Sequence, residues 1–194
     1  MRNTHSSSLF KFLTICVVVI ASSACSVATN RYQVSPFNVG ELKEANIDAC
    51  SVGSFVLGNQ PGVIDPMHFR GFSRFKSPVG DSFADYIAKA LSDELALAGA
   101  YSPDSELNIS GTVVMHNFDA SDLVVGTGDL GVEFVVKRGT GVVYKKVVSI
   151  RHEFDSSFFG AAAASNMNIA YPIAVSKLLG KLIDDKDFIA AMKH

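Results

Sequence analysis

The stretch LGVEFVVKRGTGVVYKKVVSI, residues 130–150, decides the fold. Apolar and polar side chains alternate on both sides of Arg138-Gly139-Thr140-Gly141, and a period of two is typical of β-strands. A short glycine-containing segment between two such strands predicts a tight hairpin. A third alternating segment, Leu107 to Phe118, precedes them. We therefore expect strands at 107–118, 130–137 and 142–154 that form an antiparallel meander.

The segments before this meander predict a strand and a helix. Residues 49–57 (ACSVGSFVL) favour a strand that places Cys50, Val52 and the Ser54/Val56 positions on one face. The helix begins at Ser77-Pro78 or at Asp81-Ser82, because both pairs suit a helix start. It ends near Ala98, before Gly99. Its apolar residues recur every fourth position and predict one buried face: Val79, Phe83, Ile87, Leu91 and Leu95.

A second helix is expected from about Asn168 to Asp184, with Ile169 and Ile173 on its apolar side. Pro172 must lie in its first turn or kink it. The order of elements predicts an α+β fold, a two-layer βαβββα domain in which a four-stranded mixed sheet carries both helices on one face.

The amino terminus has the pattern of an export signal. Arg2 and Lys11 precede the apolar run 12–21, and the small residues Ser22-Ser23-Ala24 come directly before Cys25. The run is shorter than the roughly 20 residues that span a bilayer. Small residues before a cysteine resemble the lipobox of bacterial lipoproteins, in which that cysteine is acylated, although Ser22 stands where an aliphatic residue is usual. The alternative is ordinary cleavage near Ala24, which would leave a soluble periplasmic protein whose Cys25 could pair with Cys50.

These features divide the chain into three parts: a lipoprotein signal peptide at 1–24, a lipidated Cys25 with a tether at 25–47, and a single α+β domain at 48–194. Ser26 follows the cysteine, which resembles an outer-membrane sorting signal. We expect a lipid-anchored protein on the periplasmic face of the outer membrane. The 17 basic and 19 acidic residues give a net charge of −2, which argues against nucleic acid as a partner.

The long connection 58–77 contains the candidate binding residues. It interleaves aromatic and basic side chains: Phe69, Arg70, Phe72, Arg74, Phe75 and Lys76. Loops of this length are often functional. The pattern predicts contact with an envelope partner or a lipid headgroup, or packing of the phenylalanines on their own domain.

Motifs that would signal catalysis are weak or absent in the sequence. Residues 126–131 spell G-x-G-x-x-G, but a strand follows them, so we expect a turn and a bulge rather than a nucleotide site. His116 and His152 lie on separate strands that could bring them together, yet no metal-ligand spacing occurs. Asp184, Asp185 and Asp187 suggest a solvated helix end, and Cys50 suggests a buried small residue. We expect no catalytic residues, no cofactor and no metal.

Two segments resemble YajG-type lipoproteins of the Gram-negative envelope. They are 164–170 (ASNMNIA), followed by an apolar helix and Phe188, and 95–101 (LALAGAY). The resemblance covers about residues 48–192 and implies a small α+β lipoprotein without assigned catalytic residues. Our first hypothesis is a non-enzymatic accessory or binding component that contacts an unknown envelope protein or glycan. The alternatives are a periplasmic carrier of a small ligand or lipid, or an accessory subunit of a lipid-transport system.

Overall fold

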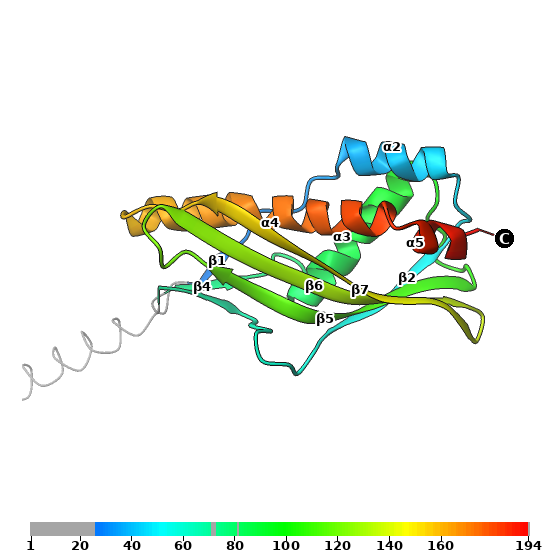
Figure 1. The fold of residues 1–194 in the computed structure, drawn as a ribbon, viewed down its shortest axis with the longest axis horizontal. Helices are drawn as coiled ribbons and strands as arrows, with labels where there is room; N and C mark the ends of the chain where they lie inside the picture. Colours follow the sequence, from blue (N-terminus) through cyan, green and yellow to red (C-terminus); the bar gives the residue numbers. More distant parts are fainter. Residues whose placement is uncertain (1–25, 71–72, 81, 194) are drawn as a thin grey trace, which may run out of the picture.

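The computed structural model describes residues 26–70, 73–80 and 82–193. Its main sheet has four strands in the order β2-β5-β6-β7, with bounds Ser51–Leu57, Leu107–Asp119, Val125–Arg138 and Gly141–Asp155. Helices α3 (Phe83–Ala98) and α4 (Gly160–Ile183) cover one face of this sheet (Figure 1). Strand β2 runs parallel to β5, and the other pairs are antiparallel. The predicted two-layer α+β fold with a mixed sheet is confirmed.

A second, three-stranded sheet lies beside the first. It has the order β1-β4-β3, with bounds Ser26–Ala28, Ser73–Lys76 and Met67–Phe69. Part of the predicted loop 58–77 is therefore regular structure. The short strands had no visible period in the sequence, because three or four residues are too few to establish one.

The hairpin between β6 and β7 forms as predicted, with Gly139 at a φ of +57° in the turn. The G-x-G-x-x-G segment differs from the prediction because it lies inside β6 and forms no turn. The rings of Phe154 and Phe118 lie over Gly126 and Gly128, where an added Cβ would come within 2.4 and 2.3 Å of them. A register irregularity does occur nearby, between Val113 and Met115 of β5. These glycines make room for aromatic rings.

The predicted face of the first strand is only partly correct. Cys50 is buried, but Phe55 enters the core and Val56 is half exposed. The register between β2 and β5 shifts between Val52 and Phe55, and a shift of one residue exchanges the two faces of a strand.

Helix α3 starts at the second of the two predicted positions. The Ser82 side chain accepts a hydrogen bond from the Ala84 N–H, and Gly99 ends the helix with a φ of +79°. Helix α4 begins before the predicted Asn168 and contains Pro172 in its interior. Ile169 and Ile173, expected on its buried side, are exposed. The buried face is instead formed by another set, which includes Met167, Tyr171, Val175, Leu178 and Leu182.

The segment expected to be a tether contains a helix, α2 (Pro36–Ala45). Ser35 caps its amino end, Asn46 ends it with a φ of +48°, and Leu42 is buried. In Figure 1, α2 lies on the outer side of α3 and α4, away from the sheet. The packed structure therefore begins before residue 48. The sequence shows no clear helical pattern here, because α2 buries only a narrow apolar stripe, chiefly Val39 and Leu42.

One hydrophobic core joins both sheets and the helices. Phe83, Tyr86, Tyr171 and Phe134 fill the space between the main sheet and the helices, and Met67 and Phe75 of the small sheet belong to the same cluster. A short helix, α5 (Lys186–Ala191), follows α4 near the carboxyl end, which lies at the opposite end of the molecule from β1 (Figure 1).

Candidate functional site

The small sheet brings the candidate binding segment next to the start of the described chain. Ser26 pairs in parallel with Arg74, and His68 pairs with Arg74 on the other side. Ser26 is the residue directly after Cys25, which itself lies outside the described residues, as does the signal peptide. Strand β4, which carries Arg74 and Lys76, and the start of β1 thus lie side by side in the small sheet.

The residues of the predicted binding segment fall into different environments. Phe75 is fully buried, whereas its neighbours Arg74 and Lys76 are exposed, because alternate side chains of a strand point to opposite faces. Phe69 contributes its backbone to β3. Phe72 lies outside the described residues. Of the described side chains in this segment, Arg74 and Lys76 face solvent and are available for a partner.

Arg70 has a role that the sequence did not reveal. Its guanidinium donates hydrogen bonds to the carbonyl oxygens of Ala120 (3.1 Å), Ser157 (2.5 Å) and Phe158 (3.2 Å). These carbonyls belong to the β5–β6 loop and the β7–α4 loop. Arg70 therefore fastens the β3–β4 hairpin to both loops. Side-chain bonds to distant backbone carbonyls leave no pattern in a sequence.

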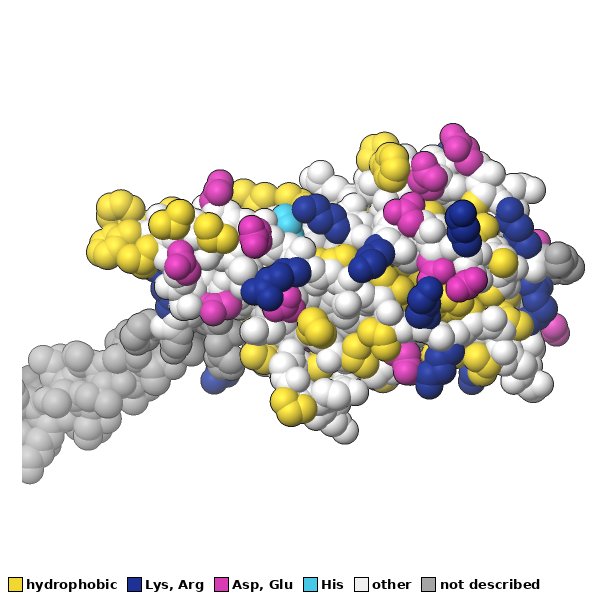
Figure 2. Space-filling view, in the orientation of Figure 1, with side chains coloured by type: hydrophobic (Ala, Val, Ile, Leu, Met, Phe, Trp, Pro, Cys, Tyr) yellow, Lys and Arg dark blue, Asp and Glu magenta, His cyan; other side chains and the backbone are white. Residues whose placement is uncertain are grey.

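The two loops held by Arg70 expose a group of apolar side chains, here called the apolar tip: Leu123, Val124, Phe158 and Phe159. They are 51%, 72%, 71% and 74% exposed, respectively. Figure 2 shows hydrophobic side chains gathered at this end of the molecule. The sequence contains both apolar pairs, Leu123-Val124 and Phe158-Phe159, in segments between predicted elements, but it does not show that they are exposed on neighbouring loops.

Backbone hydrogen bonds hold the tip loops in place. The Ser156 N–H donates to the Val124 carbonyl at 2.8 Å, and the Ser156 hydroxyl donates to the Ala120 carbonyl at 3.3 Å. Asp122 accepts the N–H groups of Val124 at 2.7 Å and Val125 at 3.0 Å, and these bonds lower the pKa of its carboxyl. The apolar side chains are thus presented by an ordered support.

The two candidate histidines do not form a joint site. His116 is fully buried, with Nδ1 2.6 Å from the Ile64 carbonyl and Nε2 3.1 Å from the Tyr171 hydroxyl. Burial lowers its pKa to about 4. His152 has Lys177 as its partner, with Nζ 3.1 Å from Nδ1. Across residues 26–70, 73–80 and 82–193, no three His, Cys, Asp or Glu side chains gather closely enough to hold a metal ion.

The acidic cluster after α4 is more than a solvated helix end. Asp185 accepts hydrogen bonds from the Tyr144 hydroxyl at 3.0 Å and the Asp187 N–H, and pairs with Lys146 at 2.7 Å. Burial opposes its ionisation, but these donors outweigh burial and lower the pKa of Asp185. It therefore joins α5 to β7, which corrects the prediction for this residue.

A buried carboxyl, Glu94, organises the contacts of α2. It accepts hydrogen bonds from the Tyr32 hydroxyl, the Ser35 N–H and Asn38 Nδ2, the last at 3.0 and 3.1 Å to its two oxygens. Burial raises the pKa of Glu94, and these donors oppose the rise. Asn38 also donates to the Ser176 carbonyl of α4 at 3.0 Å. These hydrogen bonds join α2 to α3 and α4.

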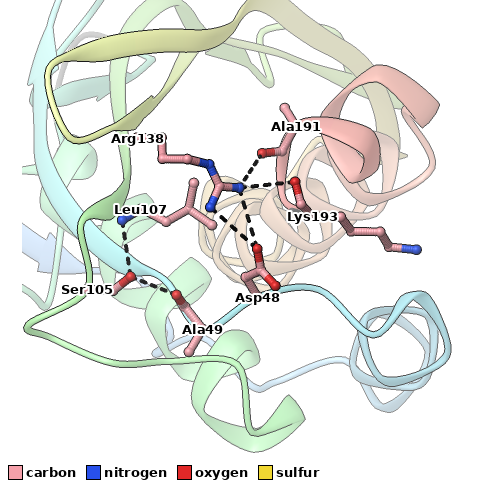
Figure 3. Close-up of polar contacts among 7 residues, drawn as sticks. All are labelled: Asp48, Ala49, Ser105, Leu107, Arg138, Ala191 and Lys193. Atoms are coloured by element: carbon pink, nitrogen blue, oxygen red, sulfur yellow. Dashed lines mark hydrogen bonds and ion pairs between the residues drawn. The ribbon is translucent and has the colours of Figure 1, made fainter.

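Polar contacts also close the end of the molecule opposite the tip (Figure 3). Arg138, next to the β6–β7 turn, bonds to Asp48 at 3.4 Å and to the Lys193 carbonyl at 3.1 Å. Ser105 donates to the Ala49 carbonyl at 2.7 Å and accepts from the Leu107 N–H at 3.1 Å. These bonds tie the hairpin to the start of β2 and to the carboxyl end.

A surface groove of about 480 Å³ runs between α4 and the segment before α2. Its apolar wall includes Ile169, Pro172 and Ile173, and its other wall includes Arg31 and Val34. The alternative function, a carrier of an apolar ligand, requires a cavity between the main sheet and the helices. The described aromatic side chains pack together in that space.

Comparison with known proteins shows the fold. No family model matches the chain. No curated protein matches it in sequence. Its structure is similar to that of a Xanthomonas campestris protein of the DUF330 family, with a TM-score of 0.51 and 12% identity over 81% of this chain and 94% of that one.

Two further structures are less similar, with TM-scores of 0.43. One is a candidate lipoprotein from Caulobacter crescentus, with 12% identity over 76% of this chain and 90% of that one. The other is a hypothetical protein from Chlamydia trachomatis, with 7% identity over 71% and 96%. In the part of the chain that the structure describes, no helix is long and apolar enough to cross a membrane. The comparisons thus establish an α+β fold shared with the DUF330 protein.

Proposed function

We propose that this protein is a lipoprotein of the Gram-negative envelope that acts by binding and not by catalysis. Acylated Cys25 anchors it to the periplasmic face of the outer membrane. There it serves as an accessory component of an envelope assembly and contacts a protein or glycan. The likeness of residues 95–101 and 164–170 to YajG-type lipoproteins is part of this proposal.

The observation that carries the proposal is the position of Cys25. An apolar run too short to span a bilayer and three small residues precede it. The first described strand, β1, begins at the next residue and pairs with β4. A chain cleaved before Cys25 would therefore carry its acyl groups directly beside the folded domain. Two or more acyl chains are enough to hold a protein stably on a membrane.

The titratable groups support a binding role. His116, Glu94 and Asp185 are all engaged in contacts that join elements of the fold. None of these three side chains is among the residues that line the groove along α4, although Ser35, whose N–H donates to Glu94, does line it. Arg74 and Lys76 supply the solvent-facing part of the predicted partner-binding segment.

The test is the intact mass of the mature protein, made in a Gram-negative host and extracted from its membranes. We expect a chain that starts at residue 25 and carries a diacylglyceryl group and an amide-linked acyl chain. Replacing the anchor cysteine (Cys25→Ser) should remove the added mass and release the protein from washed membranes.

The matched control is Cys50→Ser, which alters a cysteine that is buried and free. That variant should keep both the lipid mass and the membrane association. An unmodified thiol at position 25 in a wild-type protein that washes off the membranes would contradict the proposal.

A further inference from the structure

The apolar tip consists of bulky side chains that are each more than half exposed. Four bulky side chains from two separate loops stand together, and the rings of Phe158 and Phe159 pack edge to face at 5.7 Å. The loops that carry them are hydrogen-bonded to each other. Exposed apolar side chains on an ordered support are typical of a surface that contacts a membrane or another protein.

The chain direction relates this tip to the anchor. Strand β1 runs parallel to β4, so its first residue, Ser26, lies toward the end of the small sheet where β4 begins. That end is also the β3–β4 turn, next to Arg70. Arg70 bonds to Ser157 and Phe158 of the tip loops. Cys25 is joined to Ser26 by one peptide bond, about 3.8 Å between Cα atoms. The first residue of β1 and the tip therefore lie at one end of the molecule.

We propose that the apolar tip inserts into the membrane leaflet that holds the acyl chains of Cys25. This inference rests on the proposed lipid anchor, and it adds a second point of contact that fixes the orientation of the domain. Transfer of aromatic and aliphatic side chains from water to the interfacial region of a bilayer lowers the free energy. The far end, with the β6–β7 hairpin and the carboxyl terminus, then points away from the membrane (Figure 1).

The charges around the tip decide which kind of contact it makes. Asp119, Asp122 and Asp155 are exposed at the base of the tip loops, while Arg74 and Lys76 are exposed on β4. This mixed rim has no strong positive field to attract anionic lipids. Apolar burial must drive the contact, so it should persist in neutral lipid and at high salt.

The sequence offers a clean probe because it contains no tryptophan. A single tryptophan can replace Phe159 at the tip (Phe159→Trp). The matched control is Phe37→Trp, since Phe37 is 67% exposed on α2, close to the 74% of Phe159. The full acylated protein is reconstituted into phosphatidylcholine vesicles whose acyl chains carry bromine, which quenches tryptophan fluorescence on contact.

We expect the lipid bromines to quench F159W at least about twofold more strongly than F37W, because interfacial insertion places a side chain about 5–10 Å into the headgroup boundary. Its emission should also shift to shorter wavelength, at low and high salt alike. F37W should remain open to a water-soluble quencher. Equal, weak lipid quenching of both variants on vesicles that carry the protein would overturn the tip contact and leave the anchor intact.

Two other outcomes separate the alternatives. If F159W is shielded only in native envelope membranes and is not quenched by lipid bromines, the tip binds a protein and the leaflet contact is refuted. If the protein does not float with the vesicles, the proposed anchor fails. In that case excess vesicles are added to the free chain. A blue shift of F159W alone still supports the tip contact, and no shift refutes it.

Discussion

His116 shows how a single buried side chain can set the acid sensitivity of this protein. Its imidazole packs against Phe83, with ring centres 4.8 Å apart, and both of its nitrogens have partners in the core. It stays neutral because burial makes the charged form costly, so its pKa falls from 6.5 to about 4. In the unfolded chain the same group takes up a proton near pH 6.5.

We expect the free energy of unfolding to fall as the pH drops from 6.5 to 4. In that range the unfolded chain binds a proton at His116 and the folded chain does not, so the loss from this group reaches about 3 kcal/mol. The variant H116F should lose this part of the pH dependence. At neutral pH it should be about 1–3 kcal/mol less stable, because the Ile64 carbonyl and the Tyr171 hydroxyl lose a partner.

Urea unfolding at several pH values measures both effects, with H152Q as the control. Burial and the neighbouring Lys177 also lower the pKa of His152, so H152Q should remove only the part of the acid sensitivity that belongs to His152 and leave the part that H116F removes. Parallel pH profiles for wild type and H116F would show that His116 does not titrate as described.

At the scale of elements, α2 shows that a helix with little apolar surface can still be part of the fold. Its contacts depend on Asn38, which reaches Glu94 of α3 and the Ser176 carbonyl of α4. Gly180 of α4 lets this side chain approach, since a Cβ there would lie 3.0 Å from the Asn38 amide oxygen. Hydrogen bonds thus hold α2 against the other helices, whereas α3 is held by its apolar face.

The substitution N38A should lower the free energy of unfolding by about 1–3 kcal/mol, because Glu94 remains buried with fewer donors. Thermal or urea unfolding measures the change, and E44A on the exposed side of α2 is the control. If N38A and E44A unfold alike, residues 36–45 are the tether that the sequence suggested.

At the scale of the whole molecule, the small sheet and the main sheet share one core. Phe75 of β4 is fully buried in the cluster that also contains Phe83 and Tyr171, and Arg70 adds hydrogen bonds to the tip loops. The segment that carries the candidate anchor is therefore built into the domain, so a force on the anchor would be transmitted to the core.

We expect F75A to destabilise the entire protein by about 3–5 kcal/mol, as loss of a buried aromatic side chain usually does. R74A, which changes an exposed neighbour, should stay within about 0.5 kcal/mol of wild type. Far-ultraviolet circular dichroism and tyrosine fluorescence should follow one transition in F75A. An early, separate transition of β-structure would show that the small sheet is an independent unit.

The sequence by itself determined the fold class, the hairpin at 138–141 and the end of α3 at Gly99, and it limited the start of α3 to two positions, of which the structure selects Ser82. Each of these depends on local periods or on backbone preferences of neighbouring residues, which are written in the sequence. It also singled out Cys25 and the basic segment 70–76 as candidates.

Only the tertiary structure decided what those candidates touch. It placed Phe75 in the core and Arg70 against three distant carbonyls, it made α2 part of the packed domain, and it brought Leu123-Val124 and Phe158-Phe159 together as the apolar tip. Contacts between residues far apart in the chain depend on strand register and helix packing, and the composition of a short segment does not contain that information.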